Sequence, residues 1–111
     1  MLVIRKKVYN IGMAKESDLQ ATIMHWLRGH GAVAFKYQQN ATTRAALPDI
    51  FFVKDGFWGA IEVKKTKTSP FRPGQKETVA KLDSMSWARV VWGGKNSNWP
   101  EVQKELTEML K

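Results

Sequence analysis

Two carboxylates and one lysine are spaced so that a β-hairpin would bring them together. Asp49 opens one apolar run, and Glu62 and Lys64 end the next one. Asp55-Gly56 stands between the two runs, and this dipeptide is a strong signal for a two-residue hairpin turn. If these two residues form the turn, Asp49 lies opposite Glu62. Lys64 then shares the sheet face of Glu62, because side chains alternate along a strand.

This pairing has a chemical consequence. Directly opposed residues have Cβ atoms about 4.5–5.5 Å apart, where like charges are destabilising. Two carboxylates at this distance are suited to bind a divalent cation, with Lys64 beside them as a partner for a proton or a phosphate. Taken singly, Asp49 could cap a loop and Lys64 could belong to a solvated basic run, but the shared register and face favour a site. A one-residue shift of register would separate the carboxylates.

The elements that must position these residues follow from apolar periodicity and turn signals. Their order is helix, three strands, helix, strand, helix, which predicts a small α/β sandwich. A capping box from Ser17 to Gln20 is expected to start the first helix. The expected elements are a helix over 15–28, strands over 33–37, 48–53 and 57–64, a helix after Pro73 to about Met85, a strand over 88–92, and a last helix capped by Asn98 with Val102, Leu106, Met109 and Leu110 on one face.

Two further polar residues are expected to face inward. Glu16 lies on the same helix stripe as Leu19 and Ile23, although a favourable interaction with the helix dipole explains it equally well. Gln75 lies four residues before Val79, on the core-facing stripe of the second helix. The alternative for Gln75 is an exposed position in the first helical turn.

Composition limits the class of protein. The chain has 111 residues, no cysteine and a formal charge of +8, which excludes disulfide and thiolate chemistry and favours a polyanionic partner such as nucleic acid. Much of the positive excess lies in two blocks, residues 1–15 and 54–81. No apolar run reaches the roughly 20 residues of a membrane span, and a cytoplasmic location is expected. Residues 1–12 are expected to form an arm or strand, and 13–111 a single domain.

The same residues carry a family resemblance. Pro48-Asp49, followed after twelve residues by Glu62-Val63-Lys64, resembles the signature of PD-(D/E)XK nucleases. Together with Glu16 on the preceding helix and Pro73-Gly74-Gln75 before the next one, the order is similar to that of the VRR-NUC branch. The resemblance covers about residues 14–92. It implies a restriction-endonuclease-like fold.

The resemblance also implies an activity, the metal-assisted hydrolysis of phosphodiester bonds. Asp49 and Glu62 would bind Mg²⁺ or Mn²⁺ with the main-chain carbonyl of Val63, and Glu16 would act on the same or a second ion. Carboxylate and carbonyl oxygens are the ligands that these ions prefer. Lys64 would orient or activate the attacking water.

In the same resemblance, Gln75 would support Lys64 or the scissile phosphate, and nearby basic side chains would bind DNA. The implied enzyme is a structure-directed endonuclease, with Holliday junction resolvase-like homodimers among its relatives. Such a dimer would use the apolar side of Val102–Leu110 or the arm Leu2–Ile11. The alternatives are a restriction-like nuclease and a DNA-binding module that does not cleave. The expected DNA-binding residues are Arg44, Lys65, Lys67, Arg72 and Lys76.

Overall fold

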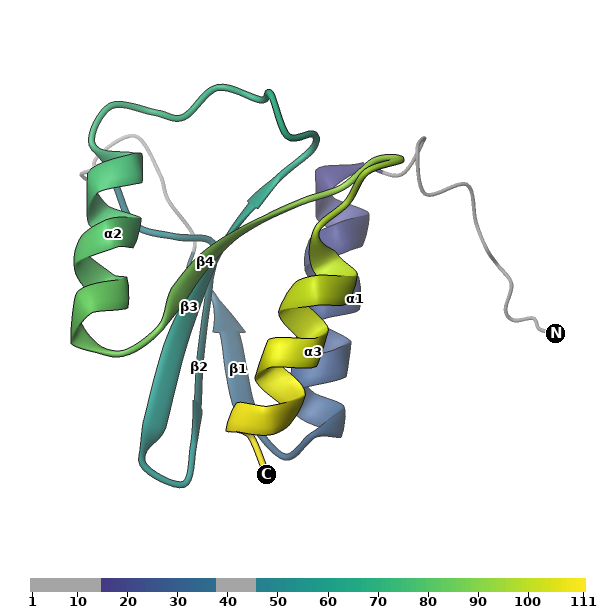
Figure 1. Cartoon of the computed structure of the whole chain (residues 1–111), viewed down its shortest axis with the longest axis vertical. Helices are drawn as coiled ribbons and strands as arrows, with labels where there is room; N and C mark the ends of the chain where they lie inside the picture. The colour runs from purple at the N-terminus through teal and green to yellow at the C-terminus, as the bar shows by residue number, and fades with distance from the viewer. Residues whose placement is uncertain (1–14, 38–45) are drawn as a thin grey trace, which may run out of the picture.

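The computed structural model describes residues 15–37 and 46–111. They form three helices and four strands in the order predicted from the sequence (Figure 1). The elements are α1 (Glu16–Gly29), β1 (Val33–Lys36), β2 (Ile50–Lys54), β3 (Phe57–Lys64), α2 (Gln75–Met85), β4 (Ala88–Trp92) and α3 (Trp99–Met109). Within these ranges no helix is long and apolar enough to cross a membrane.

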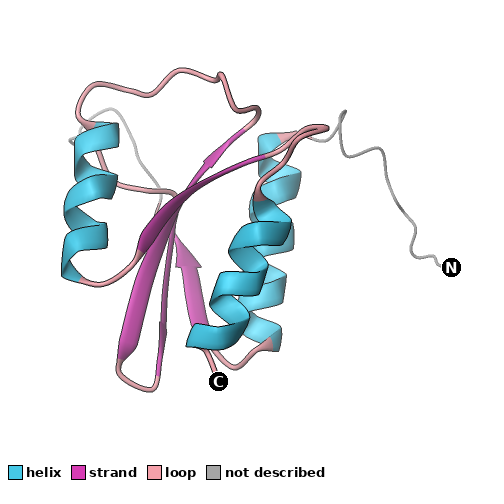
Figure 2. Cartoon of the chain, in the orientation of Figure 1, coloured by secondary structure: helices cyan, strands magenta, loops and turns pink. Residues whose placement is uncertain are grey.

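The four strands form one mixed sheet between two helical layers. Its order is β1-β2-β3-β4, with β1, β2 and β3 antiparallel in sequence and β4 parallel to β3. Helix α2 connects the two parallel strands and packs on β3 and β4. Helices α1 and α3 lie together on the other side of the sheet (Figure 2). The connection from β3 to α2 therefore passes over one end of the sheet, where the site residues lie.

The hairpin between β2 and β3 has the predicted register. The pairs run from Lys54 opposite Phe57 to Ile50 opposite Ile61. Asp55 and Gly56 have φ values of 50° and 84°, and two successive positive φ values are the mark of the type I′ turn that Asp-Gly favours. Strand β2 begins two residues later than expected. Asp49 therefore stands just outside the strand, one pairing step beyond Ile50.

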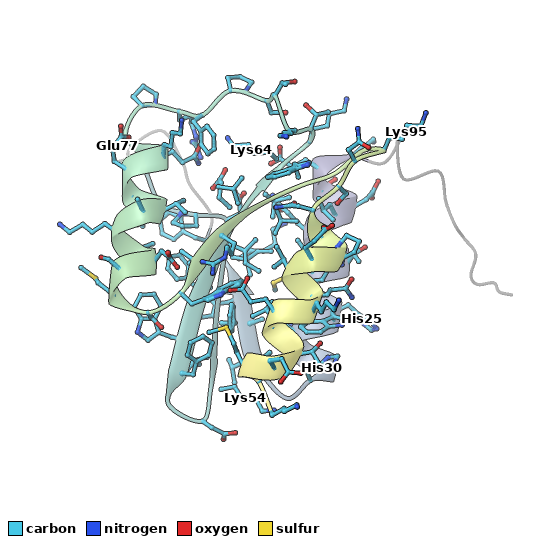
Figure 3. The ribbon with its side chains drawn as sticks, in the orientation of Figure 1. His25, His30, Lys54, Lys64, Glu77 and Lys95 are labelled. Atoms are coloured by element: carbon cyan, nitrogen blue, oxygen red, sulfur yellow. The ribbon has the colours of Figure 1, made fainter. Side chains whose placement is uncertain are left out.

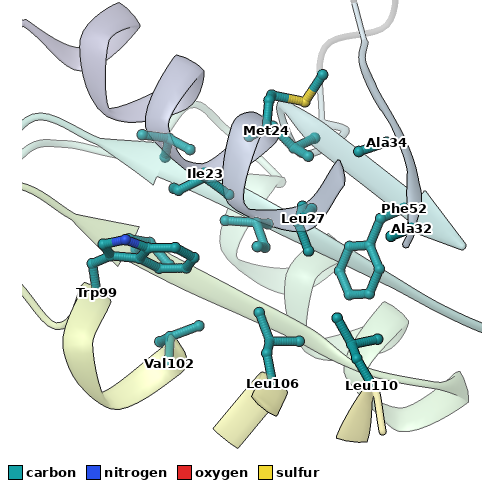
Figure 4. Close-up of a cluster of buried hydrophobic side chains, with 14 of the residues drawn as sticks. Ile23, Met24, Leu27, Ala32, Ala34, Phe52, Trp99, Val102, Leu106 and Leu110 are labelled. Atoms are coloured by element: carbon teal, nitrogen blue, oxygen red, sulfur yellow. The ribbon is translucent and has the colours of Figure 1, made fainter. Parts of the chain in front are cut away.

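The larger core lies between the sheet and helices α1 and α3. Ile23 and Leu27 from α1 and Leu106 from α3 are fully buried (Figure 4). They pack on the sheet face that carries Phe52 and Val91. A smaller cluster of Ala60, Val79 and Ala88 lies under α2. Because both faces of β3 are covered, its last residues, including the site residues, are buried.

Three expectations about the helices are wrong. Helix α1 begins with Lys15 as its N-cap, whose N–H donates to the Asp18 carboxylate at 3.1 Å, so the Ser17–Gln20 capping box does not form. The side chain of Asn98 does not cap α3, because it bonds to the main chain of β4 instead. Met109 is 40% exposed, and Leu110 takes the buried position.

The expected dimer face on the last helix is also wrong. Val102, Leu106 and Leu110 are buried in the core of the chain itself, so that side of α3 is not free to contact a second copy. The alternative arm, Leu2–Ile11, lies outside the described residues.

A close approach at Gly59 generates a stability prediction. A Cβ atom there would lie 2.5 Å from Phe52 Cζ and 2.9 Å from Trp87 Cε3, closer than any real contact. We expect Gly59→Ala to lower the free energy of unfolding by about 1–3 kcal/mol through overpacking, as measured by urea denaturation.

Gly29→Ala is the matched control. A Cβ atom there meets nothing within 4 Å, so this change should leave stability equal or raise it by about 0.5–1 kcal/mol. Equal effects of the two substitutions would contradict the packing at Gly59.

Candidate active site

Asp49 and Glu62 converge at the end of the β2–β3 hairpin. The Val63 N–H donates to Asp49 Oδ2 at 2.8 Å, and the carbonyl of Asp49 accepts from the Tyr37 N–H at 2.8 Å. These bonds fix Asp49 between β1 and β3 although it is not itself in a strand. Glu62 lies one step before Val63 and is only 2% exposed. The register therefore places both carboxylates together, as the sequence predicted.

Lys64 is held as a buried cation beside these carboxylates. Its ammonium donates to Gln75 Oε1 at 2.9 Å and to the carbonyl of Pro70 at 2.9 Å, and lies 3.3 Å from Glu62 Oε2. It also stands 4.7 Å from the centre of the Phe71 ring. An ammonium group has three protons, and these three oxygens match them. Lys64 is thus fixed in position rather than belonging to a solvated basic run.

Gln75 opens α2 and is completely buried, which excludes the exposed alternative. Its Oε1 accepts from Lys64 and from the Arg72 N–H at 3.1 Å. Because both neighbours are donors, the amide oxygen must face them. Gln75 Nε2 is then left buried without a hydrogen-bond partner among the residues that the structure describes. Within these residues, the site contains a donor without a partner on the same side chain that holds the Lys64 ammonium.

Glu16 lies in the first turn of α1 and is half-buried. Its carboxylate accepts from Gln20 Nε2 at 3.4 Å. Burial raises the pKa of Glu16, and the negative charge of Asp49 raises it further, which places the two groups within electrostatic range. Within the described parts of the chain, however, no three His, Asp or Glu side chains are gathered closely enough to hold one ion. Glu16 therefore stands beside the Asp49–Glu62 pair without joining it.

The site carries more negative charge than its surroundings balance. Burial and the neighbouring Asp49 raise the pKa of Glu62 to about 7, although Lys64 opposes the shift. Burial also raises the pKa of Asp49, against the Val63 N–H and Lys64, which lower it. Both carboxyl groups thus resist full ionisation as long as no further cation is present.

The arrangement fits a divalent cation. Glu62 Oε1 is buried and has no hydrogen-bond partner among the described residues. A buried acceptor without a partner costs about 1–3 kcal/mol, and this one lies beside a second carboxylate in a site with raised pKa values. A hard cation would satisfy this oxygen and offset both charges, and the two carboxylates offer the oxygen ligands that such a cation prefers. These residues fit Mg²⁺ or Mn²⁺.

The basic residues expected to bind DNA lie at the same end of the sheet. Lys65, Lys67, Arg72 and Lys76 are exposed on the β3–α2 connection and the first turn of α2. Lys67 stands 5.8 Å from the centre of the Trp92 ring, and Lys76 stands 5.9 Å from that of Phe71. Arg44 lies outside the described residues.

The sequence did not single out other basic residues near the site. Lys95, on the β4–α3 connection, lies at the same end of the molecule as Lys64, whereas Lys54 lies at the opposite end (Figure 3). Lys15 lies next to Glu16 at the start of α1 and borders the same pocket as Lys95 and Lys65. Lys95 follows two glycines and has no basic neighbour. Only the three-dimensional fold shows that these three lysines converge.

Comparison with known proteins supports the fold. No family model matches the sequence, and the comparison with curated proteins found no match. Among solved structures, a "VRR_NUC domain protein" aligns with a TM-score of 0.57 at 21% identity, covering 81% of this chain and 86% of that one. Hjc, a Holliday junction resolvase from Archaeoglobus fulgidus, aligns with a TM-score of 0.56 at 18% identity, covering 72% of this chain and 69% of that one. The predicted restriction-endonuclease-like α/β fold is confirmed, and the family named from the motif is among the structural neighbours.

The electrostatics of the carboxylate pair predict a pH dependence. Because the pKa of Glu62 is raised from 4.5 to about 7, its contribution to stability is present at low pH and is lost as the pH rises through about 7. In chelator at pH 8, we expect Asp49→Asn to raise the melting temperature by roughly 5 °C, with the difference disappearing toward pH 5. Mg²⁺ or Mn²⁺ should raise the melting temperature of the parent but not of the variant.

Asp55→Asn is the control, since it removes an exposed carboxylate from the hairpin turn. It should leave both the pH dependence and the response to metal unchanged. An Asp49→Asn protein that melts lower in chelator at pH 8, or gains as much from metal as the parent, would show that the carboxylates do not share a site.

Proposed function

We propose that this chain is a divalent-metal-dependent DNA endonuclease that hydrolyses phosphodiester bonds. The observation that carries the proposal is a pair of buried atoms, on two side chains that contact Lys64, that have no hydrogen-bond partner among the described residues. Glu62 Oε1 is an acceptor that a cation would satisfy, and Gln75 Nε2 is a donor that a phosphate oxygen would satisfy. Both side chains contact Lys64 directly.

In this proposal Asp49, Glu62 and the main-chain carbonyl of Val63 would hold Mg²⁺ or Mn²⁺, and Glu16, which stands beside this pair, would act on the ion through water or on a second ion. The bound ion would supply Lewis-acid chemistry, lowering the pKa of water and offsetting negative charge on the phosphate. The protein's part is to keep the two carboxylates together through the hairpin register. The Val63 N–H restrains Asp49 at 2.8 Å.

Lys64 and Gln75 act on the substrate. The fixed positive charge of Lys64 orients the attacking water and stabilises the extra negative charge of the pentavalent phosphate. Gln75 Oε1 accepts from the ammonium at 2.9 Å and keeps it in place. The Nε2 of the same side chain, which has no partner among the described residues, can donate to a phosphate oxygen. Water adds to phosphorus, and the P–O bond to the leaving strand breaks. One strand end keeps the phosphate, and the leaving oxygen of the other end takes up a proton released from the attacking water and becomes a hydroxyl.

The surface around the site supports DNA as the polyanion. The exposed cations Lys65, Lys67, Arg72 and Lys76 border the catalytic end of the sheet. Lysine and arginine contacts to phosphates supply most of the sequence-independent affinity for DNA. A DNA-binding module without cleavage would have no use for buried atoms that lack a partner, because each one destabilises the fold. Glu62 Oε1 and Gln75 Nε2, which lack a hydrogen-bond partner among the described residues, therefore favour an enzyme over a binding module.

The first test of this function separates chemistry from binding. Lys64→Ala should reduce Mg²⁺- or Mn²⁺-dependent cleavage of labelled DNA at least 100-fold, because the fixed charge at the phosphate is lost. DNA affinity should fall only modestly and should weaken steeply with salt in both proteins.

Lys104→Ala, which removes an exposed cation from α3, is the matched control and should cleave like the parent. Circular dichroism checks that each variant folds. Cleavage by Lys64→Ala at a rate comparable to the parent would contradict the assigned role.

A branched substrate is the finer proposal. One of the structural neighbours is a Holliday junction resolvase, and resolving a four-way junction requires two paired incisions. A chain of this size carries one site, so paired incision would require a homodimer with two-fold symmetry.

The assembly and the paired incision are tested by two measurements. Sedimentation velocity with and without a four-way junction should show a dimer, and Mn²⁺ should give paired nicks in opposite strands. A monomer under both conditions would contradict junction resolution, leaving a nuclease that cuts one strand at a time.

A further inference from the structure

A pocket of about 250 Å³ opens beside the proposed catalytic centre. It lies on the side of the sheet that carries α1 and α3, where the first turns of both helices meet the ends of β3 and β4. Glu16 and Lys64 line it, so it adjoins the proposed metal site. None of the roles assigned above uses this pocket.

The walls of the pocket are largely apolar. Leu19 from α1 and Trp99 from α3 line it, together with Pro100 and the main chain of Gly93 and Gly94. A Cβ atom at Gly93 would lie 3.1 Å from the Lys65 carbonyl oxygen and 3.4 Å from Leu19 Cδ2, so this wall fits closely only without a side chain. Apolar walls of this kind suit a flat ring more than ordered water, which needs several polar partners.

The rim of the pocket is basic. Lys15, Lys65 and Lys95 border it, and none of the three forms an ion pair with another residue that the structure describes. Asp18 also lies at the rim, but its carboxylate already accepts the main-chain N–H of Lys15. An apolar slot surrounded by free cations matches a ligand with a ring and attached phosphates.

We propose that this pocket receives one unpaired nucleotide of the DNA strand, next to the phosphate that is cut; this inference rests on the proposed function. The base contacts Leu19 and the small part of Trp99 that borders the pocket, since Trp99 is 8% exposed, and the flanking phosphates contact Lys15, Lys65 and Lys95. The volume, somewhat below the roughly 300 Å³ of the smallest typical ligand pockets, suits a single nucleotide and excludes a base pair.

The proposal gives a physical origin for a preference for branched or distorted DNA. A base within a duplex must be unstacked and unpaired before it can enter a pocket, and that step costs free energy. A base at a bulge, a flap or a junction avoids much of this cost. The pocket thus selects the structure of the DNA, and no base-edge contact is needed.

The test is a binding measurement in chelator, where metal-dependent cleavage does not occur. Fluorescence anisotropy compares a labelled duplex that contains one unpaired nucleotide with the same duplex carrying an abasic unit at that position. The parent should bind the base-bearing duplex about tenfold more tightly, a ratio within the range for stacking of one base on an aromatic side chain.

Thr22→Trp blocks the pocket, because Thr22 lines it from the exposed side of α1. The variant should lose the tenfold preference. Thr107→Trp is the matched control on α3. Both threonines are exposed and donate to the carbonyl four residues earlier, at 3.0 Å for Thr22 and 2.8 Å for Thr107. Thr107 does not line the pocket, so this variant should keep the preference.

Equal binding of the two duplexes by the parent, or a preference that survives in Thr22→Trp, would overturn the pocket proposal. The first comparison uses only the parent and holds even if the Thr22 variant fails to fold. An absent preference with intact metal-dependent cleavage overturns the pocket alone. A preference without any cleavage under Mg²⁺ or Mn²⁺ overturns the nuclease and supports the pocket. Failure to bind either duplex overturns both.

Discussion

The register of the β2–β3 hairpin is the constraint on which the site depends. The type I′ turn at Asp55 and Gly56 fixes each pairing step, from Lys54 opposite Phe57 to Ile50 opposite Ile61. The next step brings Asp49 to Glu62, where two like charges must be held in a buried place. The main-chain bond from Val63 to Asp49 keeps them there at 2.8 Å. A register shifted by one residue would move the side chains of a strand to the opposite face of the sheet and would separate Asp49 from Glu62.

The rest of the site balances the charge that this register creates. The positive charge of Lys64 offsets part of this negative charge, and Gln75 and the Pro70 carbonyl hold the ammonium in place. The balance stays incomplete, because the pKa of Glu62 is still raised to about 7 by burial and by Asp49. This residual negative charge, together with the unpartnered Glu62 Oε1, is the physical basis for expecting a divalent cation. If the proposed cation binds there, it would offset this charge and raise the stability of the fold.

Much of the fold and of the candidate site could be predicted from local signals in the sequence. Asp-Gly determines a turn type, the turn determines a register, and spacing along a helix places Gln75 inward. The alternation over residues 33–37 predicted a strand but not its orientation: small Ala34 faces the core, while Val33 and Phe35 are exposed. The features that the sequence did not predict depend on contacts between separate elements of the fold. Asn98 bonds to β4 rather than to its own helix, and the pocket bordered by Lys15, Lys65 and Lys95 arises from elements distant in sequence.

We propose that Asp49 and Glu62 form a cation site, and this site can be tested by locating the cation itself. A crystal of the protein soaked in Mn²⁺ and measured at the manganese absorption edge would show the ion by its anomalous scattering. We expect a strong peak in contact with the carboxylates of Asp49 and Glu62 and the carbonyl of Val63. A crystal in which manganese occupies only other positions, such as the exposed His25 and His30, would contradict it.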